Sequence, residues 1–208
     1  GSVTEVFRLA HREACERLMA KYAGRAGIGH VRYATCGKED RSYAQPFERH
    51  HIQKHKWFSF GFNGQLANYQ QLRERLLSDG DHHLARETDT EIVMHEISRE
   101  LSGDRQPTMI ELIRSVSTRF DGAYSMVLIN ARGDMVAARD PLGIKPLCYA
   151  FDGSLFAAAS ESVALLNLGF PPESVKSLPP GHVATATSRG VRIEQYAESP
   201  RRAHCFFE

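Results

Sequence analysis

Three positions in this sequence have side chains that could bind and polarise a small polar ligand. Arg32 ends a predicted strand, where its planar guanidinium could hold a carboxylate through two hydrogen bonds. Asp89 lies in the first turn of a predicted helix and could be the counter-ion of an ammonium group. Asn63-Gly64 follows an apolar run and could direct a carboxamide and an unshielded N–H at one point, as an oxyanion site requires. Taken singly, a strand-end salt bridge, a helix-capping carboxylate and a tight turn explain these residues equally simply.

The histidines could suggest a metal site, because His50, His51 and His55 are close in sequence and His82-His83 are adjacent. They have no cysteine or carboxylate partner at ligand spacing, so a solvated loop tip explains them better and we expect no metal site. His30 is most simply a hydrogen-bonded core histidine. The sequence also contains no glycine-rich phosphate loop, no Ser-His-Asp order and no aromatic–basic alternation of the kind that binds single-stranded nucleic acid.

The hydrophobic periodicity predicts the elements that must position these residues. Capping boxes at Thr88 with Glu91 and at Thr108 with Glu111 mark two helix starts. Strands, then helices, then a meander of strands joined by hairpins indicate an α+β fold with antiparallel sheets. The predicted helices cover residues 4–22, 66–78, 87–101, 107–120 and 161–168, and the predicted strands cover 27–34, 56–62, 123–130, 134–140, 146–151 and 154–160, before a last hairpin at Arg189-Gly190.

Composition limits the classes of function. The 208 residues are 42% hydrophobic, enough for a sizeable core, and 26 basic against 25 acidic residues give a net charge of +1. This charge gives no general attraction to nucleic acid or acidic lipid, and no apolar stretch approaches membrane-spanning length. The four cysteines are widely spaced and form no Cys-x-x-Cys pair, which favours a reducing cytoplasm.

Eight motifs in a fixed order carry a resemblance. They are "GIGHVRYAT", "AQPF", "GFNGQLANY", "ETDTEIV", "FDGAYSMVLIN", "RDPLGIKPL", "AAASESVAL" and "PGHVATAT". The set resembles the glutaminase domain of the class II glutamine amidotransferases over almost the whole chain. Within that class, "SESVALLNLGF" and "HCFFE" are most similar to the amidophosphoribosyltransferase family. The resemblance implies an Ntn-hydrolase-like, four-layer αββα sandwich with two antiparallel sheets, here lacking its N-terminal strands.

The resemblance also assigns roles to matching residues. Arg32 would hold the α-carboxylate of glutamine and Asp89 its α-ammonium, with Thr35 nearby on a mobile lid. Asn63 and Gly64 would form the oxyanion hole. A zwitterionic amide needs these features: a cationic group, an anionic group and donors aimed at its carbonyl. The implied activity is hydrolysis of glutamine to supply ammonia to phosphoribosyl pyrophosphate in purine synthesis, in a cytoplasmic enzyme that we expect to be a homo-oligomer.

The chain departs from the family pattern at residue 1. The family's nucleophile is a cysteine at the mature N-terminus, whose own α-amine can take the thiol proton, whereas residue 1 here is glycine. We therefore expect residues 1–196 to be a glutaminase domain incomplete at its N-terminus and inactive alone, and residues 197–208 to begin the connection to an absent phosphoribosyltransferase domain. Cys36 lacks a paired amine and base, so we expect an ordinary lid residue. Cys205 matches a position where some relatives ligate an iron–sulfur cluster, with the partner ligands outside this chain.

Two other functions fit the same sequence. One is a glutaminase-like module without catalysis, which uses Arg32 and Asp89 to sense an amino acid or only supports a partner. The other keeps the glutaminase chemistry with a different ammonia acceptor, as in asparagine synthetase or glucosamine-6-phosphate synthase, which share single motifs with this chain.

Overall fold

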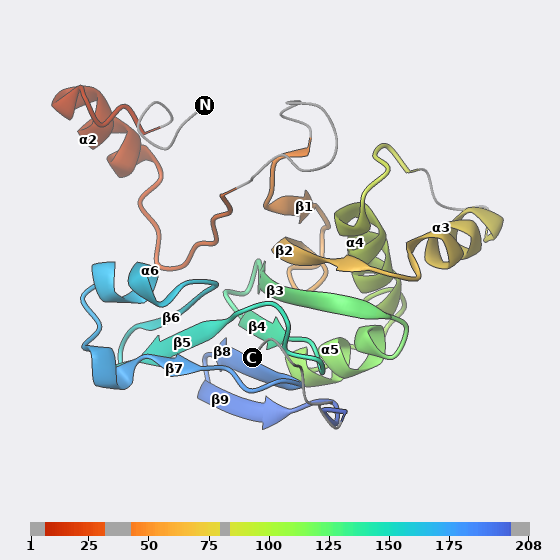
Figure 1. Ribbon diagram of the computed structural model, residues 1–208. Helices are drawn as coiled ribbons and strands as arrows, with labels where there is room; N and C mark the ends of the chain where they lie inside the picture. The colour runs from red at the N-terminus through yellow and green to blue at the C-terminus, as the bar shows by residue number, and fades with distance from the viewer. Residues whose placement is uncertain (1–6, 32–42, 80–83, 201–208) are drawn as a thin grey trace.

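The computed structural model describes residues 7–31, 43–79 and 84–200, and Figure 1 labels its elements. The described residues contain two antiparallel sheets. The larger has the strand order β1-β2-β3-β4-β8-β9 and the smaller the order β6-β5-β7. The strands are β1 (Phe47–Arg49), β2 (Phe58–Leu66), β3 (Gly122–Asn130), β4 (Met135–Arg139), β5 (Cys148–Phe151), β6 (Phe156–Ala159), β7 (Lys176–Ser177), β8 (His182–Thr187) and β9 (Gly190–Gln195).

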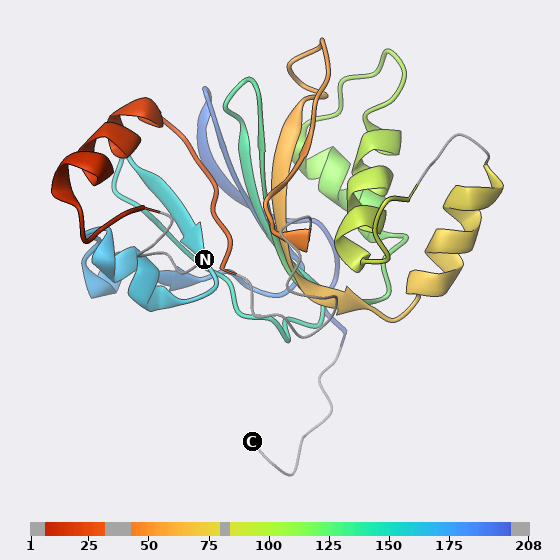
Figure 2. The same cartoon turned by 90° about the horizontal axis from the view of Figure 1, so that it is seen from above.

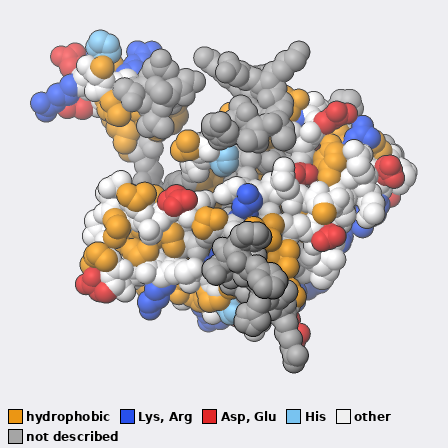
Figure 3. Space-filling model, in the orientation of Figure 1, with side chains coloured by type: hydrophobic (Ala, Val, Ile, Leu, Met, Phe, Trp, Pro, Cys, Tyr) orange, Lys and Arg blue, Asp and Glu red, His pale blue; other side chains and the backbone are white. Residues whose placement is uncertain are grey.

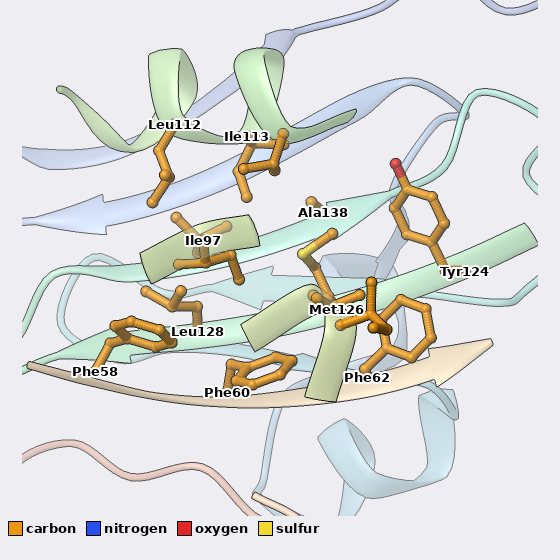
Figure 4. Close-up of a cluster of buried hydrophobic side chains, with 14 of the residues drawn as sticks. Phe58, Phe60, Phe62, Ile97, Leu112, Ile113, Tyr124, Met126, Leu128 and Ala138 are labelled. Atoms are coloured by element: carbon orange, nitrogen blue, oxygen red, sulfur yellow. The ribbon is translucent and has the colours of Figure 1, made fainter. Parts of the chain in front are cut away.

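The main core lies on one face of the larger sheet. Successive side chains of a strand point to opposite faces, so Phe58, Phe60 and Phe62 of β2 all point to this face, and each is at most 3% exposed. Figure 4 shows them packed beneath Ile97 and Leu112 of the covering helices. Burying one such phenylalanine contributes roughly 1.5–3 kcal/mol, so this alternation fixes which face of β2 meets the helices.

Three helices accompany this face: α3 (Tyr69–Ser78), α4 (Asp89–Glu100) and α5 (Met109–Ser117). The α5 helix begins with the predicted capping box, because Thr108 accepts a hydrogen bond from the Glu111 N–H and the Glu111 carboxylate accepts one from the Thr108 N–H. A fully buried Glu96 on α4 accepts hydrogen bonds from Arg75 at 2.7 Å and from Arg119 at 2.6 Å. This ion pair network joins α3 and the end of α5 to α4.

The smaller sheet packs on the opposite face of the larger one. Leu147 and Leu178 fill the space between the sheets with Ala137 and Ala184. The α6 helix (Ser162–Asn167) covers the far side through Leu165, and a short 3-10 helix, η2 (Pro172–Ser174), leads into β7. The layers therefore run helix, sheet, sheet, helix, as Figure 2 shows from above. This arrangement confirms the predicted α+β, four-layer αββα fold.

Some apolar side chains beside the smaller sheet are exposed. Apolar side chains gather over the α6 and β6 side in Figure 3. Among them Val163 is 57% exposed and Leu168 60% exposed. Among the described residues, no helix is both long and apolar enough to cross a membrane.

Several predictions from the sequence were wrong in detail. Among the described residues, the predicted helix 4–22 is represented by α2, Arg12–Lys21, with His11 as its N-cap, and residues 7–11 are not helical. Residues 27–31 form no strand, and the rest of the predicted strand 27–34 lies outside the described residues. The predicted meander is split between sheets, because after β4 the chain leaves the larger sheet to form β5, β6 and β7 and returns to it at β8. His55 is buried at 9% exposure and is not at a solvated loop tip.

Candidate active site

The Asn63-Gly64 pair lies inside β2 and is not a turn. Asn63 pairs with Ser125 and Gly64 with Tyr124, and β2 continues to Leu66. Neither residue has a positive φ, the conformation that a tight Asn-Gly turn requires. The plain turn explanation is therefore wrong, and the glycine needs another reason.

Close contact between strands explains Gly64. A Cβ atom at this position would lie 2.3 Å from the Ala123 carbonyl oxygen and 2.6 Å from the Tyr124 Cα. These are backbone atoms of the neighbouring strand, which cannot move aside as a flexible side chain could. A side chain at Gly64 would therefore push β2 away from β3.

The direction of the Gly64 N–H follows from the hydrogen-bond pattern of the two strands. Tyr124, directly opposite, uses both of its backbone groups on Asp140: its N–H donates to the Asp140 carboxylate and its C=O accepts from the Asp140 N–H, each at 3.0 Å. In an antiparallel pair this makes Gly64 and Tyr124 a pair without mutual backbone hydrogen bonds. The Gly64 N–H therefore points away from β3, towards the edge of β2 that faces β1.

Among the described residues, β1 pairs with this edge only as far as Phe60. At Phe62 the Gln45 side chain replaces a strand: its Oε1 accepts the Phe62 N–H at 2.6 Å and its Nε2 donates to the Phe62 C=O at 3.0 Å. At Leu66 the backbone acts on the Asp89 carboxyl and lowers its pKa. Gly64 lies between these two residues on the same edge, because backbone groups of alternate residues share an edge. Its N–H is thus flanked by a carboxamide on one side and a carboxylate on the other.

Asp89 is half-buried at the start of α4. Burial raises the pKa of its carboxyl, and the hydrogen bond from the Leu66 backbone opposes that rise. Thr88 caps the helix by accepting from the Glu91 N–H, but the second half of the predicted capping box is absent. The Glu91 carboxylate instead accepts from the backbone N–H groups of Ala85 and Arg86. Glu91 therefore holds the loop that leads to Asp89.

The Asn63 side chain lies on the other face of the sheet. It is exposed and shares that face with its partner Ser125, whose hydroxyl donates to the Pro146 carbonyl at 3.2 Å. His30, half-buried, lies over the same face near Gly61. Asn63 is thus next to the space between the two sheets, close to the loop of residues 141–146.

Two residues of the "RDPLGIKPL" motif hold this loop. Arg139 donates to the carbonyls of Lys145 at 2.9 Å, Gly143 at 2.6 Å and Leu178 at 2.9 Å. Asp140 is fully buried and accepts the N–H groups of the loop residues at 2.7 Å and 2.8 Å, besides that of Tyr124. Sequence reasoning used this motif only as a resemblance and assigned it no contacts. The sequence signal for these contacts was an Arg-Asp pair at the end of an apolar strand, since both side chains can form several hydrogen bonds with a neighbouring loop.

The structure thus brings together Asn63, Gly64 and Asp89 around the end of β2. Arg32 and Thr35, the other predicted ligand-binding residues, lie outside the described residues, as do Cys36, Cys205 and His82-His83. The sequence analysis assigned Gln45 no role in the site, and the only indication of such a role was its place in the "AQPF" motif. In the part of the chain that the structure describes, no three His, Cys, Asp or Glu side chains are grouped so as to hold a metal ion.

Comparison with known proteins agrees with this geometry. Residues 30–167 match the family described as "Glutamine amidotransferase domain". The amidophosphoribosyltransferase of Methanothermobacter thermautotrophicus is 39% identical over 215 residues, and that of Escherichia coli is 32% identical over 219 residues. Both alignments cover all of this chain and 41% of the relative. The chain therefore spans about two fifths of the length of these relatives.

Solved structures give the same answer for the fold. The glutamine phosphoribosylpyrophosphate amidotransferase of Bacillus subtilis, solved with ADP and GMP, is similar with a TM-score of 0.67 and 28% identity over 81% of this chain and 34% of that chain. A structure described as the allosteric regulatory enzyme of purine biosynthesis has a TM-score of 0.69 at the same identity and coverage. These neighbours confirm the Ntn-type fold, and the chain belongs to the family of glutamine amidotransferase domains.

Proposed function

We propose that this chain is the glutaminase part of an amidophosphoribosyltransferase and that the parent protein releases ammonia from glutamine. The names of the relatives support this activity, with phosphoribosyl pyrophosphate as the ammonia acceptor in a purine pathway. The observation that carries the proposal is the edge of β2 beyond Phe60, which has no partner strand among the described residues. There the Gly64 N–H lies between Phe62, which Gln45 holds, and Leu66, whose backbone acts on Asp89.

In this proposal each group has one task. The Asp89 carboxylate pairs with the α-ammonium of glutamine, and Arg32 holds the α-carboxylate with Thr35 nearby. The Gly64 N–H and the Asn63 carboxamide donate to the amide oxygen when it becomes negative. These donors are fixed in a strand, so they need little rearrangement when the charge forms.

The reaction itself follows from the chemistry of a cysteine nucleophile. A thiolate attacks the amide carbon, a C–S bond forms and the carbonyl oxygen becomes the oxyanion. The oxyanion then collapses, the C–N bond breaks and ammonia leaves with the proton that the thiol gave to the nearby α-amine. Water hydrolyses the thioester to glutamate and restores the thiol. The mature N-terminus of the native protein, read by intact mass and terminal sequencing, tests this step, because the mechanism requires a cysteine there.

Ammonia release from glutamine by the native protein is the main test of the function. Asn63→Ala should lower kcat by about 10²- to 10³-fold with little change in KM, because it removes a donor used mainly in the transition state. Asn167→Ala is the matched control, since Asn167 is exposed at the end of α6, far from β2 in the fold. Wild-type protein that binds glutamine without releasing ammonia would favour the binding module, and an unchanged kcat for Asn63→Ala would contradict the oxyanion role.

The remaining features of the parent protein stay predictions. We expect a phosphoribosyltransferase domain to follow residues 197–208, a homo-oligomer and a cytoplasmic location. The iron–sulfur ligand predicted at Cys205 lies outside the described residues, and the glutaminase chemistry proposed above uses only amino-acid side chains and backbone donors. Ammonia transfer to phosphoribosyl pyrophosphate, measured against aspartate and a sugar phosphate as acceptors, tests the choice of acceptor.

A further inference from the structure

Gln45 connects two parts of the site that are far apart in sequence. Its side-chain amide forms two hydrogen bonds with the backbone of Phe62 and a third with the Thr90 hydroxyl at 3.2 Å. Phe62 directly precedes Asn63-Gly64, and Thr90 directly follows Asp89. One half-buried carboxamide therefore contacts the neighbours of both the proposed oxyanion donors and the proposed ammonium counter-ion.

The fold shows why a side chain has this task. Among the described residues, β1 pairs with β2 only from Phe58 to Phe60, so the edge of β2 beyond Phe60 has no partner strand. A primary amide has one acceptor and two donor hydrogens. Gln45 uses the acceptor and one donor as a peptide group of a neighbouring strand would, and Nε2 also reaches the first turn of α4.

We propose that Gln45 is a positioning residue, which fixes the Gly64 N–H relative to the Asp89 carboxylate. Leu66 is a second point of contact between these groups, because its backbone lowers the pKa of the Asp89 carboxyl. The two connections lie on either side of Gly64 along the same strand edge. Loss of the Gln45 connection removes the hydrogen bonds that join the β2 edge at Phe62 to the first turn of α4, so that Asp89 and the donor can shift relative to each other although the core of α4 stays packed on β2. This inference rests on the proposed function.

Two variants of Gln45 separate positioning from folding. Gln45→Met removes all three hydrogen bonds at similar volume. Gln45→Glu keeps an acceptor for the Phe62 N–H but cannot donate to the Phe62 carbonyl or to Thr90 when ionised. We expect both variants to lower kcat/KM for glutamine hydrolysis by about 10- to 100-fold, because displacements of about 1 Å in a catalytic site can cost 10²-fold.

Thr90→Val tests the connection to α4 alone. It removes the acceptor on α4 and leaves the Gln45 pair with Phe62 intact. We expect it to act mainly on KM, since Asp89 binds the ammonium of the ground state. Combined with Gln45→Met, it should add little, because each of these two variants breaks the same hydrogen bond.

The experiment measures kcat and KM for glutamine in the native protein, with Gln71→Met and Gln71→Glu as controls. Gln71 is exposed on α3, and neither change should alter the kinetics. Amide hydrogen exchange of the Phe62 N–H reports its hydrogen bond to residue 45 directly. This exchange should be faster than in the wild type in Gln45→Met, and it should stay slow in Gln45→Glu. Loss of activity in Gln45→Glu with Phe62 still protected and the thermal midpoint unchanged supports positioning.

Three results would overturn the inference in different ways. Wild-type kinetics in both Gln45 variants of an active protein would reject the role of Gln45 and leave the proposed function standing. A wild-type protein that releases no ammonia from glutamine would reject the proposed function, and the catalytic role of Gln45 with it. A loss of activity in proportion to the unfolded fraction would show that Gln45 only supports the fold.

Discussion

Gly64→Ala is the sharpest test of how β2 and β3 approach each other. The added Cβ would lie 2.3 Å from the Ala123 oxygen and 2.6 Å from both the Cα and the Cβ of Tyr124. Tyr124 cannot retreat easily, because Asp140 holds its N–H on the far side and its ring stacks on Phe62 at 5.7 Å. The two strands must therefore separate by about 1 Å around this position to reach ordinary contact.

The cost of this separation can be given as a range. Overpacking a well-filled site typically costs about 1–3 kcal/mol, and we expect the upper half of that range because the clash is with backbone. In urea unfolding, the midpoint should fall while the slope stays unchanged, since the surface exposed on unfolding is the same. Glutamine hydrolysis should fall by about 10²-fold in the folded protein, because the N–H donor itself moves by about 1 Å.

Gly61→Ala is the matched control on the same strand. Its Cβ would have the Val127 Cγ2 atom at 3.5 Å as its nearest neighbour, which is ordinary contact. Replacing a glycine by alanine without strain can stabilise a protein by about 0.4–1 kcal/mol, so this variant should be at least as stable as wild type. Equal stability and activity of Gly64→Ala and Gly61→Ala would refute the argument from strand contact.

Two further predictions concern charge at the site and support for its loop. Glutamine affinity should fall as the pH falls through the pKa of Asp89, because only the carboxylate pairs with an ammonium. Burial raises this pKa above 3.8, so the loss of affinity should begin at a higher pH than for an exposed aspartate. Calorimetry measures the affinity, and Asp89→Asn should show no such pH dependence. Arg139→Lys should lower the free energy of unfolding by about 2–3 kcal/mol, because a lysine cannot bind the two loop carbonyls and the Leu178 carbonyl at once. Arg192→Lys, an exposed change on β9, is its control in urea unfolding, and equal midpoints for the two variants would contradict the role of Arg139.

Much of the fold could be predicted because local rules and tertiary packing agree. The alternation of Phe58, Phe60 and Phe62 and the capping box at Thr108 both appear in the structure as the sequence indicates. The positions of β2 to β6 and α3 to α6 follow for the same reason, since their periodic apolar residues form the core. The error at the first helix has the opposite cause: α2 buries no residue, so no core contact fixes its ends.

Two local predictions from the sequence differ from the structure at positions where more than one hydrogen-bonding arrangement is open to the same residues. Thr88 and Glu91 have the spacing of a capping box, yet Glu91 binds the loop at Ala85 and Arg86. Asn63-Gly64 has the composition of a turn, yet the pair continues a strand. In both cases the local pattern allows two hydrogen-bonding arrangements, and contacts between distant segments select one.

The sequence by itself determined the residue types available for binding a zwitterionic amide and, through eight ordered motifs, the family to which the chain belongs. Only the tertiary structure decided what the glycine at position 64 is for. Its N–H is directed to the edge of β2 that faces β1, because Asp140 occupies the backbone groups of Tyr124, which lies 16 residues earlier in the chain. Likewise, Asp89 reaches that edge because α4 packs beside β2, and the role of Gln45 exists only in the folded protein, where one amide contacts residues 17 and 45 positions away. Hydrogen bonds between such distant segments have no local signature, since nothing in the intervening sequence needs to record them.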